Sequence, residues 1–353
     1  MHLKRLQDLY TQRYLKRWRT LSILAIMAII TLAIAPIFGL TNLSPTLAIS
    51  SFQKVLNGKT LTLEEKIFTE LRLPRVLMCL LVGSALAVSG AAMQSIFRNP
   101  MAEPFVLGMS SGAGLGAIIG MLLAFNVYAI SASAFFMSLL AVLMVYTLAR
   151  IRGEVSIQSL LLAGIAVNFF LYALEWLLLI KTNAHMILSW LVGYFGNIKW
   201  FEVKITFIPI LLGIFLINLF SKDLNALALG EESAHYLGVN VKRVTRILIP
   251  IISLITALST AFVGLIGFVG LMVPHTVRLL VGEDNRILIP SSALFGGIFL
   301  AWADTITRSL MGDVPVGIIT MLSGAPFFLY PVSYTHLRAH ETEADLVCRL
   351  LLE

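Results

Sequence analysis

The sequence has few charged residues. Only 13% of its 353 residues are Asp, Glu, Lys or Arg, whereas a typical soluble domain carries about 25%. Hydrophobic residues make up 58% of the chain, and the mean hydropathy is +0.89. This composition excludes an ordinary soluble domain and predicts an all-α membrane protein with several spans.

Cysteines and catalytic motifs are also scarce. The two cysteines, Cys79 and Cys348, lie in an apolar stretch and in the C-terminal tail, so neither a disulfide framework nor a metal-ligand cluster is predicted. Gly58-Lys59-Thr60 resembles the end of a phosphate-binding loop, but Gln53 stands where that motif needs a glycine. We therefore expect no enzyme activity, no metal site and no cofactor in this chain.

Long apolar segments dominate the remainder. A bilayer span needs roughly 20 apolar residues, and the eighth candidate is barely long enough, which is acceptable inside a protein-packed bundle. The sequence predicts a polytopic protein of about ten transmembrane helices. These lie near 21–40, 75–96, 105–125, 128–149, 157–180, 203–220, 245–266, 268–281, 287–305 and 316–331.

Basic residues predict the orientation. Residues 1–20 are basic and run into an apolar segment without a small-residue cleavage site, so we interpret them as a cytoplasmic N-terminus before a retained first span. With that orientation most Lys and Arg fall in the inner segments. The net charge of +7 is then a topology signal, and no nucleic-acid partner is predicted.

The C-terminal end departs from this pattern. Residues 332–353 are polar and contain His336 and His340. We interpret them as a non-native tail, which we exclude from the transmembrane domain at 21–331. The alternative is a natural amphipathic helix, since the apolar residues near the end have helical spacing.

Two blocks of motif residues carry a resemblance. The first begins at Arg72-Leu73-Pro74-Arg75 and continues through Arg98, Asn99, Pro100, Glu103, Pro104 and Gly108. The second runs from Gly264 to Phe328 and contains Pro274, Gly324 and Pro326. Together they resemble the FecCD-type permeases, the membrane subunits of ATP-binding cassette (ABC) importers for iron–siderophores and vitamin B12.

This resemblance implies a fold, partners and a cargo. It implies a vitamin B12 permease-like subunit in the inner (plasma) membrane that pairs with a second copy of itself. Two ABC ATPase subunits would bind ATP and Mg on the cytoplasmic face, and a substrate-binding protein would dock outside. The implied cargo is a metal chelate, with a ferric siderophore first and haem or cobalamin as further candidates.

The loop at about 224–240 is a candidate for ATPase coupling, because a short amphipathic helix lies between glycines and resembles the coupling segment of these permeases. Small residues would let a partner approach the backbone, while acidic and histidine side chains offer polar contacts. A solvated surface helix is the alternative. The candidate coupling residues are Gly230, Glu231, Glu232, Ala234, His235, Leu237 and Gly238.

Three arginines on the predicted outer side are candidates for docking the binding protein. Arg72, Arg75 and Arg308 match the family's periplasmic arginines, and a guanidinium can bind a carboxylate through two parallel hydrogen bonds. The alternatives are interfacial snorkelling and, for Arg308, a pair with Asp304 one helical turn away.

Other features bear on packing and on the energy source. Gly112, Gly116 and Gly120 predict close helix packing, and Pro274 is expected to break or bend the eighth span.

A self-contained secondary transporter or channel is the alternative function. It would need ionisable groups inside the membrane, and only Glu175 and Asp304 are predicted there as acidic residues.

Overall fold

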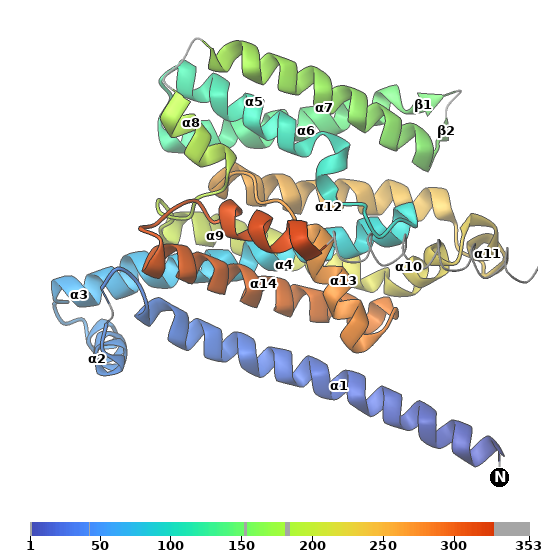
Figure 1. The fold of residues 1–353 in the computed structure, drawn as a ribbon, viewed down its shortest axis with the longest axis horizontal. Helices are drawn as coiled ribbons and strands as arrows, with labels where there is room; N and C mark the ends of the chain where they lie inside the picture. Colours follow the sequence, from blue (N-terminus) through green and yellow to red (C-terminus); the bar gives the residue numbers. More distant parts are fainter. Residues whose placement is uncertain (1, 42, 152–153, 181–183, 328–353) are drawn as a thin grey trace, which may run out of the picture.

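The computed structural model describes residues 2–41, 43–151, 154–180 and 184–327, which form a bundle of α-helices with one short β-hairpin (Figure 1). The main helices are α1 (His2–Ile34), α4 (Leu73–Phe97), α5 (Met109–Leu122), α6 (Val127–Leu148), α7 (Ile157–Leu179), α9 (Trp200–Leu219), α12 (Val241–Val263), α13 (Val269–Val281) and α14 (Asn285–Leu310). The short elements are α2 (Pro45–Leu56), α3 (Leu63–Lys66), β1 (Arg150–Ile151), β2 (Glu154–Val155), α8 (Ala184–Leu191), α10 (Ser221–Ala228) and α11 (Glu231–Tyr236).

The predicted spans correspond to helices. Within the described residues, seven helices are long and apolar enough to cross a membrane, and three shorter apolar helices complete the set. The shorter ones are α5, α13 and the helix Gly317–Phe327. The all-α, multi-span fold is therefore confirmed, whereas the predicted tail at 332–353 lies outside the described residues.

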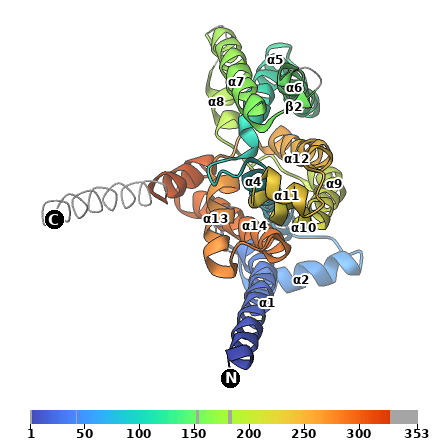
Figure 2. The same ribbon diagram turned by 90° about the vertical axis from the view of Figure 1, so that its right-hand side faces the viewer.

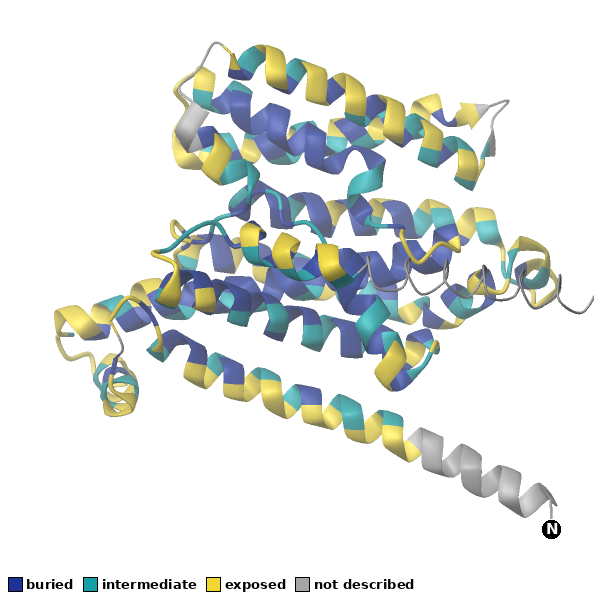
Figure 3. Ribbon diagram, viewed as in Figure 1, coloured by how far each residue is buried: buried dark blue, intermediate teal, exposed yellow. Residues whose placement is uncertain are grey.

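Helix α4 forms the centre of the bundle. It is apolar on all sides, as expected for a helix surrounded by protein, and nearly all of its residues are buried (Figure 3). Helices α9, α12, α13 and α14 surround it, while α5, α6 and α7 form a neighbouring group (Figure 2).

Glycines allow α4 to contact its neighbours backbone to backbone. A Cβ at Gly83 would overlap the carbonyl oxygen of Gly296 in α14, and a Cβ at Gly90 would overlap that of Gly270 in α13. In the neighbouring group, Gly112 and Gly116 lie against the backbone of α6. The predicted packing role of the glycines in the third span is confirmed at these two positions.

Pro274 does not break its helix, since α13 runs continuously from Val269 to Val281. A proline has no N–H, so the carbonyl of Gly270 one turn earlier loses its helical donor. That carbonyl lies against the Cα of Gly90, where a weak C–H···O contact is available. The expectation of a break is therefore wrong, and the alternative expectation of a bend stays a prediction.

The third span also begins differently from the prediction. A short 3₁₀ turn at Pro104–Leu107 precedes α5, and Gly108 joins the two with a φ of 84°. This left-handed conformation favours glycine. The apolar run from residue 105 onward therefore contains a turn that hydropathy alone did not reveal.

The connecting segments collect at two opposite ends of the bundle (Figure 1). The N-terminus, the β1–β2 hairpin and helices α10 and α11 lie at one end, and α2, α3 and α8 lie toward the other. We call these the hairpin end and the α2 end. Among the described residues, the basic N-terminal segment and the candidate coupling loop lie at the hairpin end.

Candidate functional site

The short helix that we expected between two glycines is α11, and a second short helix, α10, precedes it. α10 ends at Ala228, and Gly230 then adopts a φ of 115° as the N-cap of α11. The backbone N–H of Gly238 and of Val239 then donate to the carbonyls of His235 and Ala234, which ends the helix. Gly230 and Gly238 both need positive φ, so their role is to form the turns on either side of α11.

Six of the seven predicted coupling residues lie at the surface, and one does not. Ala234 is fully buried in its own chain, so the expectation that it opens the helix backbone to a partner is wrong. Its methyl group anchors α11 to the bundle instead. Gly230 is partly exposed, and Glu231, Glu232, His235, Leu237 and Gly238 are exposed.

An apolar surface on this segment was only partly expected, because Leu237 was a predicted coupling residue whereas Leu229 and Tyr236 were not. Tyr236 is 88% exposed, Leu229 69% and Leu237 63%, and all three belong to a segment outside the long apolar helices. We call Leu229, Tyr236 and Leu237 the apolar tip. Exposed apolar groups of this kind commonly mark a contact surface for another protein, and the polar neighbours had obscured the pattern.

The coupling segment contacts the first motif block directly. Arg98 lies at the end of α4 in a left-handed conformation, with a φ of 50°. Its Nη2 donates to Glu231 Oε1 at 3.4 Å. The structure therefore brings together two groups of predicted residues that are far apart in the sequence.

The remaining residues of the first block build the turn between α4 and α5. The Oδ1 of Asn99 accepts a hydrogen bond from the Met101 backbone N–H at 2.9 Å. Pro100 is exposed, whereas Pro104 is buried as the first residue of the 3₁₀ turn. These residues shape the connection, and Glu103 lines a cavity described below.

A second polar cluster, which the sequence analysis missed, fixes α10 to the start of α14. Asn225 donates from Nδ2 to Asp284 at 2.8 Å, and Asn225 Oδ1 accepts from the Asn285 backbone N–H at 2.8 Å. Partial burial acts to raise the pKa of Asp284, but hydrogen bonds from Arg286 and Asn225 outweigh it and bring the pKa to about 2. Asn285 in turn pairs with Ser95 of α4, so this cluster connects the coupling segment to the central helix.

Arg75 occupies the centre of an ion-pair network near the α2 end. Its Nε and Nη2 donate to Asp304 at 3.0 and 2.8 Å, and Nη2 also donates to Asp313 at 2.6 Å. The hydroxyl of Tyr194 donates to Asp313 at 2.8 Å. The network joins α4, α14 and the two loops that carry Tyr194 and Asp313.

Arg72 and Arg308 bind the segment that follows α1. Arg72 donates to the carbonyls of Ile37 at 2.9 Å and Thr41 at 2.7 Å. Arg308 donates to the carbonyl of Ala35 at 3.0 Å, and its Nε and Nη1 have no hydrogen-bond partner among the described residues.

The docking prediction implied accessible guanidinium groups, and the structure instead buries all three. Arg72 and Arg75 are 7% exposed and Arg308 is 6% exposed. The accessible position that we expected is wrong, because carbonyls and two aspartates within the chain attract these side chains inward. Asp304 likewise pairs with Arg75, not with Arg308 as the local spacing suggested.

A cavity of about 460 Å³ opens beside α7, between the 3₁₀ turn and the helix Gly317–Phe327. Its polar groups lie close to one another: Tyr172 and Ser110 hydroxyls are 3.2 Å apart. Burial raises the pKa of Glu103 to about 7, so the charge on this wall changes near neutral pH. The lining includes Glu103, Ser110, Asn168, Phe169, Tyr172 and Met321.

The remaining residues singled out from the sequence are Gly324, Pro326 and Glu175. A Cβ at Gly324 would overlap the ring of Phe268, and Pro326 is exposed near the end of its helix. Glu175 is buried in α7, and its Oε1 lies where a Cβ of Gly114 would be.

Comparison with known proteins shows to which family the chain belongs. The sequence profile of the FecCD transport family matches residues 21–333. The chain belongs to the FecCD transport family. It is 42% identical over 272 residues to the cobalamin import system permease protein BtuC of Halobacterium salinarum, covering 76% of this chain and 74% of the relative.

Further comparisons agree. The chain is 38% identical over 291 residues to the hemin transport system permease protein HmuU of Yersinia pestis, covering 79% of this chain and 87% of the relative. A solved metal-chelate type ABC transporter in an inward-facing conformation superposes with a TM-score of 0.77 at 30% identity, covering 90% of this chain and 99% of that one.

Family membership confirms several predictions. The chain is a multi-pass membrane permease subunit of an ABC importer with a vitamin B12 permease-like fold. It is a transporter subunit, not an enzyme, and ATP hydrolysis in such importers resides in partner ATPases.

Proposed function

We propose that this permease imports a metal chelate, with a ferric siderophore as the first candidate and haem or cobalamin next. The similar proteins carry names that refer to cobalamin, hemin, iron chelates and metal chelates. The cavity beside α7 supports a path for such a cargo, because it combines aromatic and polar side chains.

We propose that the hairpin end faces the cytoplasm, and that the hairpin ends of two permease copies together receive two ABC ATPase subunits. The apolar tip carries this assignment, since its three side chains are the kind of surface that a partner's groove would cover. The acidic and histidine residues around it add polar contacts at the rim. The chain itself would need no cofactor, because ATP and Mg would be bound by the partner.

The α2 end would then face outward and receive the substrate-binding protein. Docking through Arg72, Arg75 and Arg308 stays a prediction, although all three side chains are buried within this chain. A carboxylate of the partner could accept hydrogen bonds from these donors if the segment after α1 moved aside.

A second copy of the chain would complete the path. Helix α7 exposes Ile165, Phe169, Tyr172 and Trp176 along one face, and the first three line the cavity. We propose that this face lies toward the partner copy and the path between the two subunits.

Family membership argues against the alternative of a self-contained secondary transporter or channel, because ATP hydrolysis in such importers resides in partner ATPases.

The apolar tip provides the test. We expect Leu237→Ser combined with Tyr236→Ser to abolish most ATPase co-purification and cargo uptake, because two exposed apolar contacts are lost. Co-purification is measured after the permease is co-expressed with the ATPase encoded next to it. ATPase activity and cargo uptake of the complex are then measured in nanodiscs or vesicles, with the binding protein added or withheld.

Leu56→Ser is the matched control. Leu56 is 85% exposed but lies at the end of α2, on the opposite side of the bundle, so ATPase co-purification should not change. Uptake by the permease alone, without ATP and with the tip variant fully active, would contradict the proposal.

A further inference from the structure

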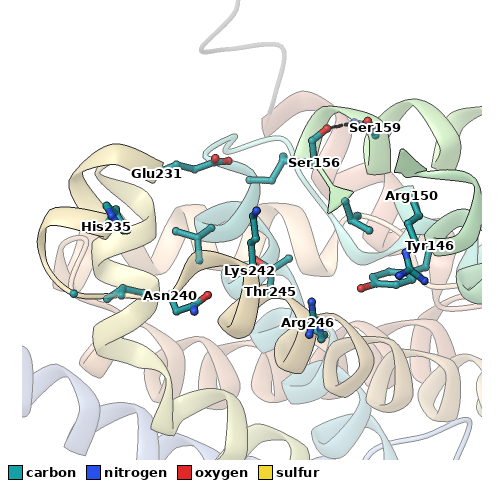
Figure 4. A pocket seen from close by; sticks show the side chains of 15 residues that line it. Tyr146, Arg150, Ser156, Ser159, Glu231, His235, Asn240, Lys242, Thr245 and Arg246 are labelled. Carbon is teal, nitrogen blue, oxygen red and sulfur yellow. Dashed lines mark hydrogen bonds between the residues drawn. The ribbon is translucent and has the colours of Figure 1, made fainter. Parts of the chain in front are cut away.

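A second cavity, of about 1200 Å³, lies at the hairpin end (Figure 4). Its walls come from the end of α6, the starts of α7 and α12, and the coupling helix α11. In Figure 4, Lys242, Thr245 and Arg246 project from α12 between His235 on one side and Arg150 and Tyr146 on the other. The cavity therefore lies between two cytoplasm-directed loops and the start of a transmembrane helix.

Positive charge predominates along its lining. Arg150, Lys242 and Arg246 all line the cavity, and the arginines are exposed. Within the part of the chain that the structure describes, neither arginine takes part in a salt bridge. Glu231 also lines the cavity, but Arg98 pairs with it at 3.4 Å. The arginines are thus available to an anion from outside the chain.

Two helix N-termini add to the positive charge that faces the cavity. Ser156 is the N-cap of α7 and Asn240 is the N-cap of α12, and both residues line the cavity. The N-terminus of a helix carries a partial positive charge. The cavity therefore combines basic side chains with two helix ends that favour the same sign of ligand charge.

Exposed apolar residues continue along two of the helices that line the cavity. Helices α6 and α12 pack against each other. α6 exposes Leu140 and Leu143, and α12 exposes Pro250 and Leu254, further along each helix from the cavity. An acyl chain could follow this apolar surface while a headgroup remained beside Arg150 and Arg246.

We propose that this cavity binds the phosphate headgroup of an anionic phospholipid. Basic pockets between transmembrane helices commonly bind such headgroups. The lipid would connect the β1–β2 hairpin to the start of α12, beside the coupling helix. The proposal is independent of the cargo, but the cavity shares Glu231, His235 and Gly238 with the proposed ATPase-coupling surface.

The test is native mass spectrometry of the purified permease with added phosphatidylglycerol or phosphatidylcholine. We expect phosphatidylglycerol to bind in preference to phosphatidylcholine. Each basic side chain near an anionic lipid contributes about a fivefold gain in affinity, so Arg150→Gln combined with Arg246→Gln should weaken binding about 25-fold.

Arg243→Gln is the matched control, because Arg243 is exposed on the same helix but does not line the cavity. Equal loss with this control, or equal binding of the two lipids, would overturn the proposal. Full competition by inorganic phosphate would show a free-anion site and would also overturn it. Loss of ATPase association by the double variant, with unchanged lipid binding, would assign the cavity to a protein partner instead.

Discussion

Arg75 lies between two carboxylates of very different exposure. The side chain of Asp304 is 1% exposed and that of Asp313 is 26% exposed. Taking the guanidinium away leaves a buried charge without compensation. We therefore expect Arg75→Gln to lower the free energy of unfolding by about 3 kcal/mol or more.

Asp313→Asn provides the comparison, because removing a partly exposed charge should lower the free energy of unfolding by only about 1 kcal/mol. Both variants are measured by thermal denaturation of the detergent-solubilised protein. Burial acts to raise the pKa of Asp313, but hydrogen bonds and charge from Arg75 outweigh it, so its pKa is lowered. Its contribution is complete above about pH 4 and is lost on further acidification. Equal losses for the two substitutions would contradict this account.

Helix α4 depends on the absence of a side chain at Gly90. Alanine normally favours a helix over glycine by about 0.5–1 kcal/mol, but here its Cβ would overlap the Gly270 carbonyl. We expect Gly90→Ala to lower the melting temperature, with an overpacking cost of about 1–3 kcal/mol. Gly267→Ala is the control, since a Cβ there meets nothing within 4 Å; a matching loss in this control would rule out the packing explanation.

The elements were more predictable than their contacts. Apolar segments of spanning length located the transmembrane helices, because bilayer thickness requires a long continuous apolar run. The Gly90–Gly270 contact and the Arg75–Asp313 pair have no local signal, since the paired residues lie in distant segments that only the folded bundle brings together. Family motifs pointed to Arg98 and Glu231 separately, and only the structure showed that they form a pair.

The two ends of the helix bundle make different kinds of contact. At the hairpin end, the apolar tip, the Arg98–Glu231 pair and the Asn225–Asp284 cluster connect the surface to α4 and α14. At the α2 end, buried arginines hold the loops to the same two helices. A movement of α4 relative to α14 would therefore be felt at both ends, which is the coupling that an alternating-access importer requires.

The exposed face of α7 is the surface through which we expect two copies of the chain to assemble. Phe169 is 72% exposed and lines the cavity beside α7, whereas Phe136 on α6 is 67% exposed and does not line it. We expect Phe169→Cys, in a background with Cys79→Ala and Cys348→Ser, to give a cross-linked dimer in membranes treated with a short bismaleimide. Phe136→Cys should remain monomeric under the same treatment. Equal cross-linking at both positions would indicate random collision in the bilayer, and the assignment of the α7 face to a second copy would then fail.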